Sequence, residues 1–191
     1  MSADAMTTVH CQPCAGATVG FVFICPGRFE ANRGYPCAAG TGANLARALV
    51  ELNRRAPEVF RSPQRSDYLV TNAWSTVEYP ALTGRSVPSE AEVLAPANLD
   101  RLAAEIAQLQ TVVACGAQAH AALRAISLRR PELRVAYARH LSQRSVNMIP
   151  GGSDTPQRIA RWVDLVLAQI AEADAGNEAG PQSGKTAPAV L

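Results

Sequence analysis

Short apolar runs alternate with longer segments of helical spacing along most of this chain. Runs rich in β-branched residues predict four strands, at residues 18–23, 67–72, 111–115 and 133–137. Apolar residues repeated every three or four positions predict helices at residues 43–52, 89–109, 117–128 and 155–173. Strands separated by helices indicate a mainly parallel sheet covered on both faces. We therefore expect an α/β protein, a three-layer α/β/α sandwich around a four-stranded sheet.

The length of 191 residues suits one domain of ordinary size. We expect a mobile leader over residues 1–16, a folded domain over 17–173 and a disordered tail over 174–191. No apolar run is long enough to span a membrane, and no basic region precedes the first run as it does in secretory signals. These features predict a cytoplasmic monomer that does not bind membranes.

The first predicted strand stops at Pro26 and Gly27 and leads into a loop rich in glycine. Proline cannot continue a sheet ladder, and glycine allows the backbone to approach a ligand closely. A helix follows, with Thr41 as a candidate N-cap. The segment contains neither G-x-G-x-x-G nor Gly-Lys-Ser/Thr, which excludes a dinucleotide fingerprint and a P-loop. We predict a site for an acceptor-rich planar ring or a phosphate here, with an ordinary connection as the alternative.

Three more loops begin where predicted strands end, at Asn72, Gly116 and His140. The carboxyl ends of parallel strands meet at one edge of a sheet, where ligands of such proteins bind. One crevice is therefore expected to hold all four loops.

The net charge of +2 is too small to indicate nucleic-acid binding by itself. The basic residues are almost all arginine, with Lys185 as the single lysine. Arginine can clamp phosphates, and several arginines lie beside the predicted site loops. These are Arg28, Arg33, Arg139 and Arg144.

Cys11 and Cys14 form a C-x-x-C pair before the first predicted strand, next to His10. Two thiols at this spacing can bind zinc, a cluster or each other, but a four-ligand site needs further ligands at suitable places. Two reduced thiols are the favoured interpretation. A redox role stays open, although redox C-x-x-C pairs normally lie at a strand-to-helix turn.

Five motifs, in consistent order over about residues 19–170, resemble those of the uracil-DNA glycosylase superfamily, especially its bacterial and archaeal iron-sulfur branch. The resembling segments are Phe23–Ala31 with Gly34–Cys37, Thr71–Asn72, Pro88–Glu92, Ala114–Ala117 and His140–Ser142. The resemblance implies a monofunctional hydrolase that removes a deaminated base, such as uracil, from single- or double-stranded DNA.

The chain also departs from the family's pattern. The cluster-bearing branch completes its C-x-x-C with two later cysteines, which are missing here, so we expect no cofactor. Ile24 replaces the polar residue that positions water, and Cys37 replaces the aromatic residue that stacks on the base. A catalytically silent protein that binds nucleic acid or a base without cleavage is therefore the alternative.

The resemblance assigns roles to residues of three kinds. The catalytic candidates are His140, donating to the base oxygen, Asn72, reading a pyrimidine edge, and Glu30, activating water. The base-binding candidates are Pro26, Gly27, Phe29, Tyr35 and Cys37. The DNA-binding candidates are Ser142, Arg144 and Asn147, which would hold phosphates, and Leu141, which would wedge the duplex apart. Surface exposure, capping or plain packing is the alternative for each, and His120 is expected to be structural or exposed.

Overall fold

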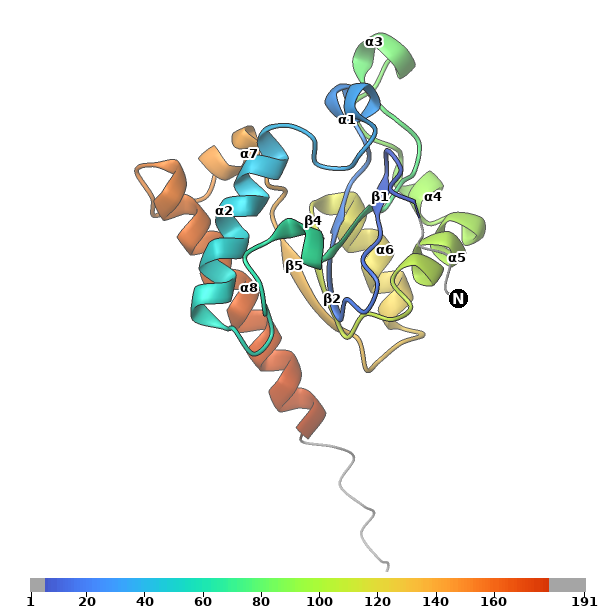
Figure 1. Cartoon of the computed structure of the whole chain (residues 1–191). Helices are drawn as coiled ribbons and strands as arrows, with labels where there is room; N and C mark the ends of the chain where they lie inside the picture. Colours follow the sequence, from blue (N-terminus) through green and yellow to red (C-terminus); the bar gives the residue numbers. More distant parts are fainter. Residues whose placement is uncertain (1–5, 179–191) are drawn as a thin grey trace, which may run out of the picture.

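A five-stranded sheet forms the centre of the protein, whose computed structural model describes residues 6–178 (Figure 1). Its strands are β1 (Cys11–Gln12), β2 (Val19–Phe23), β3 (Leu69–Asn72), β4 (Thr111–Cys115) and β5 (Arg134–Ala138). The order is β1-β3-β2-β4-β5, with β1 antiparallel to β3 and the other pairs parallel. The predicted α/β class and mainly parallel sheet are confirmed, but the expected count of four strands is wrong.

Helices cover both faces of the sheet, and side chains of β2 alternate between two hydrophobic cores. Phe21 and Phe23 belong to one core with residues of α2 (Gly40–Arg55) and α8 (Thr155–Glu178), while Val22 belongs to the other with residues of α5 (Pro96–Glu105) and α6 (Ala117–Ser127). Figure 1 shows these two pairs of helices on opposite sides of the sheet. This alternation explains why β2 is buried along its whole length. The helices are α1 (Arg28–Arg33), α2 (Gly40–Arg55), α3 (Pro80–Thr83), α4 (Glu90–Val93), α5 (Pro96–Glu105), α6 (Ala117–Ser127), α7 (Gln143–Asn147) and α8 (Thr155–Glu178), with a 3₁₀ turn, η1, at Arg65–Asp67.

The N-terminal segment is part of the sheet. Cys11 pairs with Thr71 and Gln12 with Val70, and Cys11 is buried. The expectation that residues 1–16 form a mobile leader is therefore wrong for this segment, because backbone pairing anchors it to β3. At the other end, α8 continues to Glu178, past the predicted boundary at residue 174. The rest of the predicted tail, residues 179–191, lies outside the described residues.

The helix predicted over residues 89–109 is two helices. Ser89 accepts a hydrogen bond from the Glu92 amide, and Glu92 accepts one from the Ser89 amide, which forms a capping box at the start of α4. Helix α4 ends at Val93, and Pro96 begins α5. Proline lacks an N–H group and its ring clashes inside a helix, but it is tolerated in the first turn.

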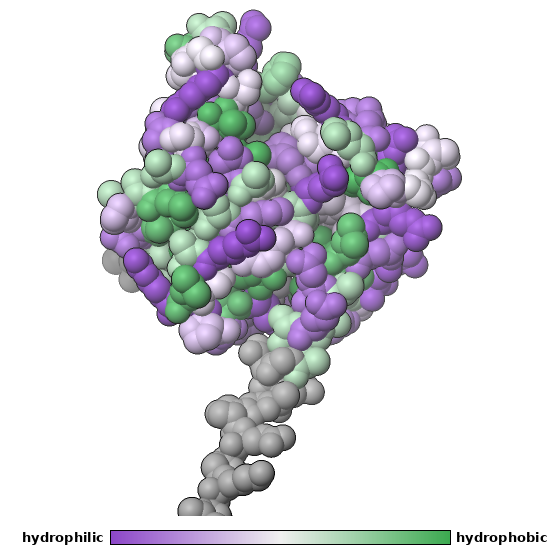
Figure 2. Space-filling model, turned by 180° about the vertical axis from the view of Figure 1, so that it is seen from behind, coloured by the Kyte–Doolittle hydropathy of each residue, from purple (hydrophilic) through white to green (hydrophobic). Residues whose placement is uncertain are grey.

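The surface turned away from the viewer in Figure 1 mixes polar and apolar side chains (Figure 2). Among residues 6–178, no helix combines the length and hydrophobicity needed to cross a membrane.

Helix α2 begins one residue before its predicted cap, with Ala39 rather than Thr41 as the N-cap. Its first turn lies against the preceding loop, where Cys37 has a φ of +52°. A Cβ atom at Gly42 would overlap the Cys37 carbonyl oxygen, which also accepts a hydrogen bond of 3.1 Å from Arg65. Glycine at position 42 therefore allows the close contact between helix and loop.

We expect Gly42→Ala to destabilise the protein by about 1–3 kcal/mol, because the added methyl group pushes α2 away from the loop. Gly40→Ala is the matched control, since no atom lies within 4 Å of a Cβ at that position of the same helix. Gly40→Ala should change stability by less than about 1 kcal/mol. Urea unfolding of the two variants measures the difference, and equal midpoints would contradict the packing argument.

Candidate ligand-binding site

A cavity of about 450 Å³ opens at the carboxyl edge of the sheet, within the size range of small-molecule sites. Its walls are the end of β2 and the following loop, the end of β3, the segment around residues 78–87, the first turn of α2 and the segment 140–145. The lining residues are Phe23, Ile24, Cys25, Gly27, Glu30, Cys37, Thr41, Asn72, Glu78, Ser86, Val87, His140, Ser142, Arg144 and Ser145.

Three of the four loops predicted to converge thus contribute to the cavity. The fourth lies directly behind its wall, because a Cβ at Gly116 would lie 2.8 Å from Ile24 Cδ1 and 3.5 Å from His140 Cβ. The loop after β4 therefore supports the cavity without lining it.

His140 presents one particular nitrogen for interaction with a ligand. The Ser142 amide donates a 3.0 Å hydrogen bond to His140 Nδ1, so a neutral ring carries its proton on Nε2. Burial lowers the pKa of His140 to about 4, although the Glu30 carboxylate acts in the opposite direction. The ring packs edge-on against Phe23, with 5.5 Å between centroids. At neutral pH, His140 is therefore an uncharged N–H donor at the cavity wall.

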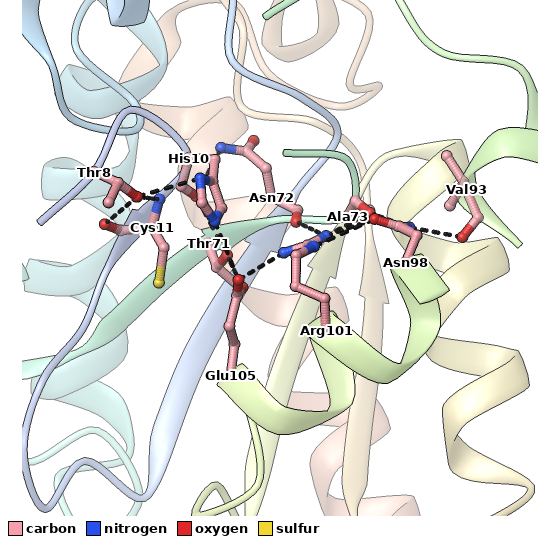
Figure 3. A network of polar contacts seen from close by, with 10 residues as sticks. All are labelled: Thr8, His10, Cys11, Thr71, Asn72, Ala73, Val93, Asn98, Arg101 and Glu105. Carbon is pink, nitrogen blue, oxygen red and sulfur yellow. Dashed lines mark hydrogen bonds and ion pairs between the residues drawn. The ribbon is translucent and has the colours of Figure 1, made fainter. Parts of the chain in front are cut away.

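Asn72 lines the cavity from the end of β3 and is only 2% exposed. Its Nδ2 atom donates to the backbone carbonyl of His10 at 3.1 Å (Figure 3). No hydrogen bond to Asn72 Oδ1 is formed within residues 6–178. The amide therefore offers its oxygen as an acceptor for a ligand.

Glu30 lines the cavity and also holds the loop around it. One carboxylate oxygen accepts a 3.0 Å hydrogen bond from the Gly27 amide, and the other accepts one of 3.0 Å from the Ala38 amide. These contacts cap α1 and connect both ends of the loop. Glu30 therefore has a structural role, and its remaining lone pairs leave room for a bound water.

A second carboxylate lines the cavity, that of Glu78, which the sequence pattern did not predict as a site residue. It is 3% exposed and accepts hydrogen bonds from Trp74 at 3.2 Å and from Arg85 at 2.6 and 3.0 Å. Arg85 also donates to Glu92 at 2.6 and 2.9 Å. The connection between β3 and α4 has no periodicity, so no pattern indicated that these residues meet. Together they fix the cavity wall at residues 86 and 87.

Only two of the predicted base-binding residues, Gly27 and Cys37, line the cavity. Pro26 is buried beneath it, and its carbonyl accepts a 2.9 Å hydrogen bond from the Glu78 amide. Phe29 is 58% exposed on the outside of α1. Tyr35 lies under the Arg65 guanidinium, 5.5 Å from the ring centroid. Phe29 and Tyr35 therefore lie outside the cavity wall.

The predicted DNA-binding residues are also divided. Ser142 and Arg144 line the cavity, whereas Asn147 lies outside it and accepts a 2.9 Å hydrogen bond from Gln143. Leu141 is completely buried in the core with Val146 and Ile159. The prediction that Leu141 wedges a duplex apart is wrong, because its side chain points into the protein.

Cys11, Cys14 and His120 lie outside the cavity wall. Burial raises the pKa of Cys11 to about 11 and also raises that of Cys14, so both thiols stay protonated at neutral pH. Since the thiolate is the reactive form, these values argue against a redox role. His120 Nε2 contacts the carbonyls of Ala114 at 3.1 Å and Ala138 at 2.8 Å. Within residues 6–178, no cluster of three or more His, Cys, Asp or Glu side chains could hold a metal ion.

No protein-family model and no curated protein matches the sequence.

Leu141→Ala should destabilise the protein by about 2–5 kcal/mol, as large-to-small substitutions in a core do. Leu128→Ala is the control, because Leu128 is 88% exposed and its truncation should cost less than about 0.5 kcal/mol. Chemical unfolding gives both values. Similar, near-zero losses would restore Leu141 as a surface residue.

The contacts with Arg85 lower the pKa of Glu78 and of Glu92 to about 2. A depressed carboxyl pKa adds stability above the ordinary value near 4.5, and this stability is lost as the pH falls toward 2. We therefore expect Arg85→Met to be less stable than the wild type at pH 7, with the difference shrinking toward pH 2. Free energies of unfolding of both proteins, measured between pH 7 and pH 2, test this prediction. A stability difference that does not change with pH would contradict it.

Proposed function

We propose that this protein is a monofunctional DNA glycosylase that hydrolyses the N-glycosidic bond of a deaminated base, such as uracil. Cleavage of this bond leaves negative charge on the departing base, so a site must stabilise an anionic oxygen. The observation that carries the proposal is the uncharged His140, whose Nε2–H is available at the cavity because Nδ1 is occupied by the Ser142 amide.

Asn72 supports a deaminated base as the ligand. Its oxygen needs an N–H donor, and uracil, hypoxanthine and xanthine each carry an N–H beside a carbonyl group. Cytosine presents an unprotonated nitrogen at the same edge, which would face the Asn72 oxygen without a hydrogen bond. Turning the amide around would break its contact with His10. The Asn72 oxygen therefore favours uracil over its parent base cytosine.

Four arginines support DNA as the polymer that carries this base. Arg28 and Arg33 lie on α1, Arg139 follows β5, and Arg144 lines the cavity. None of these four forms an ion pair with a carboxylate of residues 6–178. Arginines without a carboxylate partner are available to phosphates. Arg144 offers its charge at the cavity wall, whereas Arg139 lines a separate hollow with Pro150 and Trp162.

Water activation is the role proposed for Glu30, since Ile24 supplies no polar group at the cavity. The carboxylate can accept a hydrogen bond from water in addition to those from the Gly27 and Ala38 amides. Attack of the water on the sugar would transfer its proton to Glu30, while the base leaves as an anion held by His140.

A silent base-binding or nucleic-acid-binding protein is the second candidate. The apolar Ile24 and the buried Cys37 favour it, because neither positions water nor stacks broadly on a base. Incubation with single- and double-stranded oligonucleotides bearing uracil, hypoxanthine or xanthine separates the two candidates. A glycosylase produces alkali-labile sites, whereas a silent protein binds these oligonucleotides and leaves them intact.

His140→Ala should reduce base excision at least about 100-fold, because it removes the donor to the leaving base. Ser153→Ala, at an exposed position outside the cavity, should retain wild-type activity. Single-turnover cleavage of the preferred oligonucleotide measures both rates.

The pH dependence gives a further check on this assignment. The neutral imidazole predominates above its pKa of about 4, so ionisation of His140 should not reduce the rate between pH 8 and about 5. In the mutagenesis experiment, a His140→Ala variant with the excision rate of the wild type would refute the role assigned to His140.

A further inference from the structure

A polar network lies behind Asn72 and joins α5 to the end of β3 and to the N-terminal segment (Figure 3). Asn98, Arg101 and Glu105 supply its side chains from α5. Their spacings of three and four residues bring them to one face of the helix. Arg101 Nη1 pairs with Glu105 at 2.8 Å, which leaves Nη2 directed at the strand end.

Arg101 and Asn98 form hydrogen bonds to the backbone carbonyls at and next to Asn72. Arg101 Nη2 lies 3.1 Å from the Asn72 carbonyl oxygen and 3.0 Å from that of Ala73. Asn98 Nδ2 donates to the Ala73 carbonyl at 2.8 Å. The Asn72 carbonyl belongs to the last residue of β3, and the Ala73 carbonyl belongs to the residue after it. Side chains of α5 therefore supply hydrogen-bond donors to the end of the strand.

The orientation of the Asn72 amide depends on His10. Thr71 has one hydroxyl proton and two neighbouring acceptors, Glu105 at 2.6 Å and the His10 carbonyl at 3.2 Å. The Thr71 hydroxyl donates its proton to the Glu105 carboxylate, because that contact is shorter and its acceptor is charged. The His10 carbonyl therefore accepts its hydrogen bond from Asn72 Nδ2.

The His10 ring is itself anchored, because Nε2 lies 3.1 Å from Glu105 Oε1. Burial acts to raise the pKa of Glu105, but hydrogen bonds from His10 and Thr71 and the charge of Arg101 bring it below its usual value. Glu105 is therefore an ionised acceptor at neutral pH, and His10 Nε2 is the donor in this contact.

We propose that Arg101, Glu105 and His10 are positioning residues for the candidate site. They hold the Asn72 amide with its nitrogen on the His10 carbonyl and its oxygen free for the ligand, so the N-terminal segment is part of the site. The effect on catalysis rests on the proposed function, but the amide orientation can be measured without any substrate.

Arg101→Met removes the donors to the strand end, and Arg130→Met is its matched control. Both arginine side chains are 22% exposed and both donate to two backbone carbonyls, those of Arg130 being Ile106 and Leu109 at 3.0 Å each. Arg130 does not line the cavity. The two variants should lose similar stability, which thermal unfolding verifies.

The side-chain amide protons of Asn72 provide the direct measurement, assigned by the signals that disappear in Asn72→Asp. In Arg101→Met we expect their solvent exchange to accelerate about tenfold or more, the factor that corresponds to one lost hydrogen bond. In Arg130→Met the exchange should match the wild type. Equal exchange in both variants would overturn the proposal.

Uracil excision provides the second readout. A misplaced amide should lower kcat/KM in Arg101→Met by about 100-fold, with partial rescue by Arg101→Lys and no such loss in Arg130→Met. If the wild type excises no base, the proposed function fails while the amide exchange still decides the positioning role.

His10→Ala keeps the test valid if Arg101→Met does not fold. The His10 side chain is 22% exposed, so its removal leaves the core intact while releasing the segment from Glu105. Faster exchange of the Asn72 amide supports the proposal, and exchange unchanged from the wild type contradicts it.

Discussion

The parallel pairing of β2 with both β3 and β4 determines where the candidate site lies. In this register Phe23 is the partner of Asn72, and Val22 is the partner of Ala114, so the strands end at nearly the same level. Parallel strands send their following loops to one edge, and for this reason the segments after β2, β3 and β5 form a common cavity. An antiparallel β3 would place Asn72 at the opposite edge, away from His140.

Two independent effects determine the chemistry of His140. The Ser142 amide occupies Nδ1 as a donor, which excludes a proton there, and burial disfavours the charged ring. A protonated imidazole would direct a second N–H group at the Ser142 amide, so backbone geometry and desolvation favour the same neutral state. The helical turn that follows contributes to this arrangement, because Ser142 caps α7 and its backbone position is fixed.

Most of the sheet and the loop convergence could be predicted from the sequence, because buried parallel strands leave continuous apolar runs such as residues 19–23. The two-residue strand β1 is too short to show periodicity, and its pairing depends on β3. Leu141 follows a site histidine, but its burial is set by α8 residues such as Ile159, which are distant in sequence. The Glu78–Arg85 ion pair could not be predicted either, because both residues lie in a connection without regular hydrophobic spacing.

The cavity's donors and acceptors distinguish the two ligand classes that the sequence left open. Glu30 and Glu78 bring carboxylates to the cavity, and Asn72 offers an amide oxygen. A phosphate has only acceptors for such groups and would be repelled by the two negative charges. His140 supplies an N–H donor from β5, whereas Asn72 supplies its acceptor from β3, across the two central strands. If the proposed function holds, a neutral ring that carries both a carbonyl and an N–H group fits this set of donors and acceptors better than a phosphate does, and Arg144 is the arginine at the cavity wall that a flanking phosphate would contact.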